Sequence, residues 1–231
     1  NVTNSSMIRV NNSTLTINDG TVLCNNGNGM TSNSTGGAMY ICALRDYTPT
    51  VIMNGGVIEG NYTTTSAGGV YLTGAAATFI MNGGEIRNNV SRKGAGITDN
   101  TGCNVRLNGG KIYGNTLTSN MIYAASSQIC IGSASRGANC GDFILKPAME
   151  LPANAICLGG KGQYLSIDES FANWNGVITL QHSSAVADAV AVKGVNGYTL
   201  TEADLAKFVS FHGGFHLELD AANNQIILKA N

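Results

Sequence analysis

The sequence predicts an all-β chain in which short strands stack as successive coils of a parallel solenoid. Three observations support this fold: one segment recurs four times, a second motif recurs between the copies, and apolar residues alternate with a period of 2 rather than 3.6. Only 12% of the 231 residues are charged, while Gly, Asn, Ser and Thr are abundant. This balance is typical of a solenoid whose outer faces are neutral and polar.

The recurring segment consists of an apolar strand, an Asn-Gly-Gly turn and a second short strand. The turns begin at positions 18, 54, 82 and 108, so they are 36, 28 and 26 residues apart, yet a second Asn always follows the first by seven residues. Uneven periods with constant internal spacing indicate a repeating unit whose loops differ in length. The four copies, of which the first is the weakest, cover residues 15–25, 51–61, 79–89 and 105–115.

A second motif, small residues followed by a strand, lies between these copies. It adds a third strand to each unit, after a corner where glycine permits a sharp bend. Residues 36–41, 67–72 and 94–99 carry the motif, and we align residues 119–124 with them as a degenerate fourth copy. Each coil is therefore predicted to contain three short strands separated by turns.

Stacking the copies sorts their residues into columns. Two columns are uniformly apolar and are predicted to fill the core: Ile17, Met53, Met81 and Leu107, and Val22, Ile58, Ile86 and Ile112. Two columns are mixed and are predicted to face water: Thr21, Val57, Glu85 and Lys111, and Leu23, Glu59, Arg87 and Tyr113. Equivalent residues of neighbouring coils lie about 4.8 Å apart. We therefore expect Glu59 to pair with Arg87, and Glu85 with Lys111.

The asparagines at the turns form two further columns. Asn tolerates a left-handed backbone, and stacked Asn side chains form ladders of amide hydrogen bonds. The predicted ladders are Asn18, Asn54, Asn82 and Asn108, and Asn25, Asn61, Asn89 and Asn115. Asn61 and Asn89 also match the acceptor pattern for N-glycosylation, but we favour the ladder role for both.

The repeats at residues 51–61, 79–89 and 105–115 resemble those of right-handed parallel β-helices with a pectin-lyase-like shape. Such repeats occur in large surface proteins of Gram-positive gut bacteria, and residues 36–39 resemble a motif of chlamydial polymorphic outer-membrane proteins. The resemblance covers about residues 15–124 and implies a secreted or cell-surface bacterial protein. It implies no single activity, because this fold carries lyases, hydrolases, tailspikes and adhesins.

Beyond the repeats, strand-like runs continue without the Asn-Gly-Gly turn. The predicted ranges are 1–185 for the β-helix, with the repeats at 15–124 and plainer coils at 125–185, and 186–231 for a C-terminal cap. The cap is predicted to contain a short helix at 201–208, with Thr201 as its N-cap, and a β-hairpin. Such a cap covers the last coil, whose open strand edges otherwise promote aggregation.

The net charge and the composition limit the kinds of partner that the chain can bind. The net charge is −1, so the chain offers no basic surface for nucleic acid. It contains no apolar run of membrane-spanning length. We expect a monomer without a metal or cofactor. Because the chain begins with Asn1 rather than Met, we also expect it to be a piece of a longer polypeptide.

Six cysteines allow disulfides, although none is spaced as in a C-x-x-C motif. Cys130 and Cys140 flank a loop that one bridge could close, and they are the disulfide candidate. The alternative is that the cysteines serve as small apolar residues of the core.

Two sets of residues are candidates for chemistry or binding. An enzyme that cleaves polysaccharides needs paired carboxylates, for which Glu59 and Glu85 are the candidates, although a ladder role is favoured for both. Tyr40, Tyr71 and Tyr123 fall in one outward column and could stack on sugar rings, but a row of tyrosines also stabilises a sheet by itself. The three histidines lie in the C-terminal third, and no acidic residue completes a metal site with them.

These observations favour a non-catalytic, adhesin-like module of the cell surface or the extracellular space. We expect it to bind a host glycoprotein or a polysaccharide. The alternative is a carbohydrate-active enzyme, a polysaccharide lyase or glycoside hydrolase of the pectin-lyase-like fold. A second alternative is a structural spacer.

Overall fold

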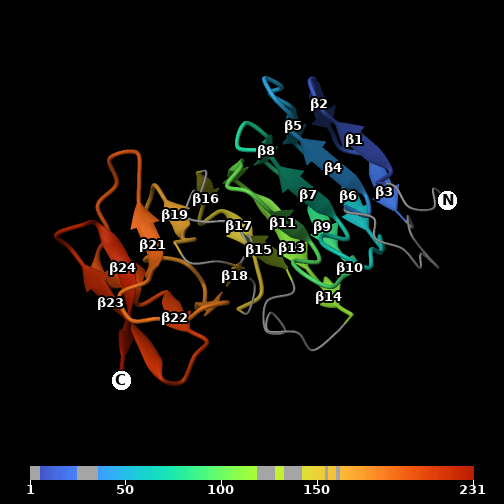
Figure 1. The fold of residues 1–231 in the computed structure, drawn as a ribbon. Helices are drawn as coiled ribbons and strands as arrows, with labels where there is room; N and C mark the ends of the chain where they lie inside the picture. Colours follow the sequence, from blue (N-terminus) through green and yellow to red (C-terminus); the bar gives the residue numbers. More distant parts are fainter. Residues whose placement is uncertain (1–5, 25–35, 119–127, 133–141, 154–155, 160–161) are drawn as a thin grey trace.

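The computed structural model confirms an all-β fold: a parallel β-solenoid of about six turns followed by a C-terminal cap. Figure 1 shows the coils stacked in chain order, from the blue N-terminal strands to the orange and red C-terminal segment. Full coils contribute one strand to each of three parallel sheets, named sheets A, B and C below. The structure describes residues 6–24, 36–118, 128–132, 142–153, 156–159 and 162–231.

Sheets A and C are parallel throughout. Sheet A contains, in spatial order, β1 (Ile8–Val10), β4 (Met39–Cys42), β7 (Val70–Thr73), β11 (Ile97–Asp99), β15 (Ile129–Ile131), β18 (Ile156–Leu158), β20 (Ile178–His182) and β22 (Phe208–Ser210). Sheet C contains β3 (Val22–Cys24), β6 (Val57–Glu59), β9 (Glu85–Arg87), β13 (Gly110–Tyr113) and β17 (Met149–Glu150). A short ladder at one corner pairs β10 (Val90–Ser91) with β14 (Thr116–Leu117).

Sheet B runs the length of the solenoid and continues into the cap. Its parallel strands are β2 (Thr14–Ile17), β5 (Thr50–Met53), β8 (Thr78–Met81), β12 (Asn104–Leu107), β16 (Phe143–Leu145), β19 (Leu165–Ile167) and β21 (Val190–Gly194). The hairpin of β23 (Phe215–Asp220) and β24 (Gln225–Ala230) is added antiparallel to β21. The predicted hairpin is therefore confirmed, and it extends the last edge of the sheet.

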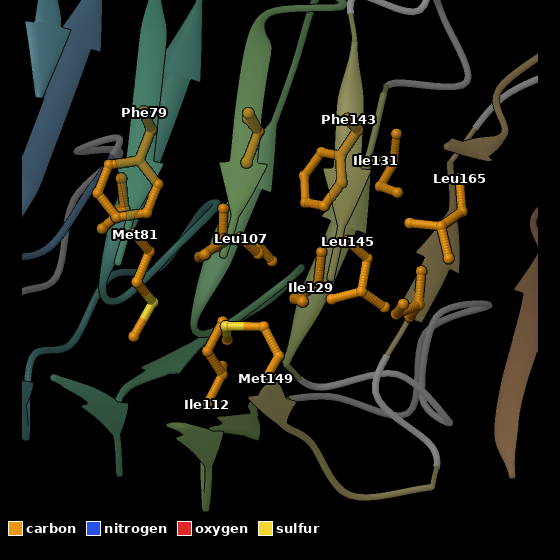
Figure 2. Packing of buried hydrophobic residues seen from close by; sticks show 14 of the residues in the cluster. Phe79, Met81, Leu107, Ile112, Ile129, Ile131, Phe143, Leu145, Met149 and Leu165 are labelled. Atoms are coloured by element: carbon orange, nitrogen blue, oxygen red, sulfur yellow. The ribbon is translucent and has the colours of Figure 1, made fainter. Parts of the chain in front are cut away.

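The predicted apolar columns form the interior of the tube. Ile58, Ile86 and Ile112 lie opposite one another in register, and all three are fully buried. Figure 2 shows side chains of successive coils, among them Ile112 and Phe143, packed into this common interior. Complete burial of one such side chain contributes about 1.5–3 kcal/mol, so the continuous interior is what holds the coils together.

The first repeat copy differs from the prediction, because its second strand is shifted by one residue. Leu23, and not Val22, lies opposite Ile58, so Val22 points outward and is 53% exposed. The predicted outward place of Leu23 is wrong for the same reason, and Val22 rather than Thr21 lies opposite Val57. The turn after Asn18 has one residue more before the strand than the later Asn-Gly-Gly turns have, which moves every following side chain to the opposite face.

Both asparagine ladders are confirmed for the described residues. On the outer ladder, the amides of Asn54, Asn82 and Asn108 each donate to the Asn of the preceding coil over 3.2, 2.9 and 2.8 Å. On the inner ladder, Asn61 donates to Asn89 and Asn89 to Asn115, each over 2.9 Å. Asn25, which we placed on the inner ladder, lies outside the described residues.

The cap contains the helix α1 (Glu202–Leu205), which begins after the predicted N-cap Thr201. The hydroxyl of Thr201 accepts a hydrogen bond from the backbone of Asp204, whose carboxylate in turn accepts from the backbone of Thr201. The helix is shorter than the predicted 201–208 because Phe208 already belongs to β22. No helix in the described part of the chain is long and apolar enough to cross a membrane.

Candidate functional site

Polar side chains gather on the outer face of sheet C. They alternate with the buried isoleucines of the same strands, so the period of two places them on the side away from the core. Parallel pairing then aligns them in two columns across the coils. We call them the sheet C cluster: Glu59, Glu85, Arg87, Lys111, Tyr113 and Glu150.

Arg87 is the centre of the sheet C cluster. Its Nε lies 2.9 Å from Oε2 of Glu59, which confirms the predicted pair, and its Nη1 lies 3.0 Å from Oε2 of Glu85. The same Nη1 donates to the phenol oxygen of Tyr113 over 3.0 Å, and the phenol donates to Glu85 over 3.0 Å. One guanidinium therefore holds two carboxylates and one phenol in fixed positions, as its planar fork of donors allows.

The predicted placement of Glu85 beside Lys111 is confirmed, but Lys111 forms its ion pair with a different carboxylate. The two residues are neighbours in register, but the ammonium of Lys111 lies 3.0 Å from Glu150 of the following coil. The hydrogen bond and the charge of Glu150 raise the pKa of Lys111. Because Glu85 is already bonded to Arg87 and Tyr113, Lys111 binds the next carboxylate along the same column.

A hollow of about 390 Å³ adjoins the sheet C cluster. It is lined by Glu85, Lys111, Tyr113, Glu150, Leu151 and Pro152. The lining thus combines the ring of a tyrosine with an ammonium donor and two carboxylate acceptors. A second hollow, of about 410 Å³, shares Glu150 and Leu151 with the first and extends to Trp174.

The predicted column of Tyr40, Tyr71 and Thr98 is confirmed in sheet A. Tyr40 and Tyr71 are neighbours in register, with ring centroids 5.4 Å apart in an edge-on arrangement, but Tyr71 is only 7% exposed. The guanidinium of Arg9 lies 5.0 Å from the ring centroid of Tyr40, and burial is the main reason that the pKa of Tyr40 is raised to about 12. The two rings contact each other, the ring of Tyr40 also contacts Arg9, and Tyr71 is buried, so they do not form an open row.

The place that we assigned to Tyr123 in this row belongs to another residue. Tyr71 lies opposite Thr98, and Thr98 lies opposite Cys130 of β15. The alignment of residues 119–124 as the fourth small-residue motif is therefore wrong. Tyr123 itself lies outside the described residues.

Glu59 and Glu85, the candidate catalytic pair, are brought together by Arg87. Both carboxylates accept from the same guanidinium, and about one third of each side chain is exposed. A glycosidase uses its two carboxyl groups in different roles on the substrate, whereas here both carboxylates are bonded to one guanidinium.

The remaining titratable residues that the sequence singled out are dispersed. Within the described part of the chain, no three or more His, Cys, Asp or Glu residues are grouped as metal ligands. His182 is buried, which lowers its pKa to about 4, while His216 bonds to Glu218 over 2.9 Å at the surface. Asn61 and Asn89 are fully buried in the inner ladder, which supports the ladder role over glycosylation.

The Cys130–Cys140 disulfide stays a prediction. Cys130 carries a free, fully buried thiol in the structure, and Cys140 lies outside the described residues. Burial also raises the pKa of Cys103. A fully buried thiol with this environment is what the alternative, a role in packing, predicts.

The sequence analysis did not identify Glu150, Leu151 and Pro152, which line the hollow. Met149 and Glu150 occupy the sheet C places of Gly110 and Lys111 without an Asn-Gly-Gly turn before them. The one available signal was the opposite charge of Glu150 and Lys111, which identifies the pair only once the register is known.

Comparison of the chain with protein-family models, with curated proteins and with solved structures found no match in any of the three.

Proposed function

We propose that this chain is a non-catalytic binding module of a secreted or cell-surface protein. Its ligand is a polysaccharide or the glycan of a host glycoprotein. The observation that carries the proposal is the hollow beside the sheet C cluster, which places the ring of Tyr113 among Lys111, Glu85 and Glu150. A sugar ring has apolar C–H faces and a rim of hydroxyl groups, so an aromatic ring flanked by donors and acceptors complements it.

The size of the hollow is consistent with such a ligand. About 390 Å³ lies within the range of small-molecule sites, which begin near 300 Å³. The adjoining hollow at Trp174 continues the surface for a further sugar residue of a longer chain. Parallel strands of sheet C run rigidly beneath the first hollow, so its side chains are held in place before a ligand arrives.

The ion pairs of the sheet C cluster support binding over catalysis. Glu59 and Glu85 are both bonded to Arg87, and Glu150 is bonded to Lys111. Three acidic groups paired with two cations leave little net charge, which suits a neutral or weakly charged sugar. Each of the cluster's three carboxylates is bonded to a cation, whereas a glycosidase uses two carboxyl groups that act directly on the glycosidic bond.

A glycan array followed by titration calorimetry tests this function. The 231-residue chain is first screened against mucin-type glycans, plant polysaccharides and uronate polymers, and the best ligand is then titrated. We expect saturable binding without any product, and about tenfold weaker binding by Tyr113→Ala, which removes the stacking ring. Tyr47→Ala, at an exposed tyrosine of a different loop, is the matched control and should bind as the wild type does.

Two outcomes would contradict the proposal. A blank array, together with a blank pull-down of host proteins, would favour a spacer. Turnover of a polysaccharide that disappears in both Glu59→Gln and Glu85→Gln would favour the lyase or hydrolase instead.

A further inference from the structure

Cys130 and Cys157 lie directly opposite each other in sheet A. They are partners in the parallel register of β15 and β18, at the centre of each strand. Both are fully buried, and both are outward-column residues that continue the column of Thr98. Neighbouring parallel strands are about 4.8 Å apart, which falls within the Cα–Cα range of about 4.4–6.8 Å that a disulfide spans.

The sulfur of Cys130 points toward the coil that carries Cys157. A Cβ added to Gly159, two residues after Cys157, would lie 3.2 Å from the Sγ of Cys130. The Cys130 thiol donates to the carbonyl oxygen of Gly132 over 3.7 Å, and the two cysteine side chains are hydrogen-bonded to each other. The two thiols therefore lie beside each other on neighbouring strands.

Lys93 brings a positive charge to this pair of thiols. Its Nζ donates over 3.0 Å to the carbonyl oxygen of Gly132, the same oxygen that the Cys130 thiol contacts. Burial alone raises the pKa of Cys130, but the hydrogen bond of Cys157 and the charge of Lys93 outweigh it, so the pKa is lowered. Since the thiolate is the nucleophile in disulfide exchange, this setting favours reaction at Cys130.

We propose that Cys130 and Cys157 are a cross-linking site that forms a disulfide between β15 and β18. The oxidant is a low-molecular-weight disulfide, such as glutathione disulfide. The bond would join two neighbouring strands within the plainer coils of the solenoid, and it would close a loop over residues 131–156. This proposal is independent of the glycan site, which lies on sheet C.

The chemistry proceeds in two balanced exchange steps. The Cys130 thiolate attacks one sulfur of the small disulfide, whose S–S bond breaks and releases one small thiolate. Cys157 then loses its proton to that released thiolate and attacks the Cys130 sulfur, which expels the second small thiolate. This second thiolate takes up the proton that Cys130 had released to the solvent. Two protein thiols are oxidised, and one small disulfide is reduced to two thiols. Because both cysteines are buried, the exchange requires that the two strands separate locally or have not yet closed.

Peptide mapping without reduction tests the cross-link directly. The reduced chain is incubated with glutathione disulfide in urea below its unfolding transition, alkylated, and digested with trypsin and a Glu-specific protease. These cleavages separate the three relevant cysteines onto residues 112–136, 137–150 and 151–161. We expect a linked pair of 112–136 with 151–161. A link of 112–136 with 137–150, which is the Cys130–Cys140 bridge, overturns the proposal, as do free thiols or glutathione adducts alone.

A stability measurement on cysteine variants provides the second readout. Oxidation should raise the urea midpoint of the wild type, because the bond restricts the unfolded chain. Cys140→Ser is the matched control and should show the same rise, whereas Cys157→Ser should show none. An equal rise in Cys157→Ser would mean that another pair forms the bond and would overturn the proposal.

Discussion

The side-chain amide of Asn89 donates to the side-chain oxygen of Asn115 over 2.9 Å, inside a corner from which water is excluded. The same oxygen also accepts from the backbone N–H of Asn89, over 3.0 Å, and the amide of Asn89 donates to the carbonyl of Ile58. Gln128 continues the ladder, since its side-chain oxygen accepts from Asn115 over 2.6 Å. Each corner therefore satisfies the buried polar groups of the coil beside it.

Asn89→Ala should destabilise the protein strongly. It leaves the backbone N–H of Asn61 without its acceptor and the carbonyl of Ile58 without its donor, both in a buried corner. Each buried polar group left without a partner costs about 1–3 kcal/mol. We expect a loss of about 2–4 kcal/mol in the free energy of unfolding by urea.

The outer ladder supplies the control for this variant. Asn82 makes the same kind of side-chain hydrogen bonds, but on the exposed side of the turn. Water replaces its partners there, so Asn82→Ala should cost less than about 1 kcal/mol. Equal losses in the two variants would show that burial of the inner ladder does not matter.

Ile86→Ala tests the file of residues at the centre of the tube. Ile86 is fully buried between Ile58 and Ile112, so its truncation leaves a cavity that the coils above and below cannot fill. We expect a loss of about 2–5 kcal/mol in unfolding free energy, measured by urea titration. Val22→Ala, at the residue that was predicted to lie in the same file, should stay within about 0.5 kcal/mol of the wild type. A large loss at Val22 would contradict the shifted register.

The stacked architecture was predictable because the repeats carry their own register. A constant seven-residue spacing between asparagines keeps Ile58, Ile86 and Ile112 at equivalent positions of their coils, although the loops between the coils differ in length. In the first copy, the same spacing predicts the wrong register for the second strand. Two consecutive asparagines, Asn25 and Asn26, allow either register there, and the decision depends on an extra residue in the preceding turn.

The candidate site was predictable only in part, because side-chain exposure is a tertiary property. Alternation placed Tyr71 on the outward side, as observed, but local patterning does not report what covers that side. Glu150 reaches Lys111 through a coil that has no repeat motif, so its register could not be read from the sequence. For the same reason, the sequence did not predict that Cys130 follows Thr98 in the column of Tyr40 and Tyr71.

Gly96→Ala tests how closely the coils approach at the small-residue corner. A Cβ at Gly96 would lie 2.6 Å from the backbone oxygen of Gln128 and 3.0 Å from the amide of Asn115. The strands would have to move apart, and we expect a loss of about 1–3 kcal/mol, measured by urea unfolding. Gly213→Ala is the control, because nothing lies within 4 Å of a Cβ there. An unchanged stability in Gly96→Ala would mean that the coils separate without cost.

The carboxylate of Asp204 fastens the cap to the solenoid and should make stability depend on pH. Its Oδ1 accepts from the backbone of Phe171 over 2.7 Å, and its Oδ2 accepts from the hydroxyls of Tyr198 and Thr201 over 2.6 and 2.7 Å. Burial alone raises the pKa of Asp204, but these hydrogen bonds outweigh it and hold the pKa below the ordinary value of 3.8.

The direction of the pH effect follows from this lowered pKa. Above pH 3.8 the carboxylate is ionised in both the folded and the unfolded chain, so its stabilisation is complete. As the pH falls below 3.8, the unfolded chain takes up the proton first, and the stabilisation is lost by the time the pH passes the folded-state pKa. Asp204→Asn should therefore lower the unfolding free energy by about 1–3 kcal/mol at neutral pH, and its difference from the wild type should shrink in acid. Urea unfolding across this pH range measures both effects. Glu202→Gln, an exposed acid in the same helix, should show neither, and a difference for Asp204→Asn that stays constant down to the lowest pH would contradict the ionic role.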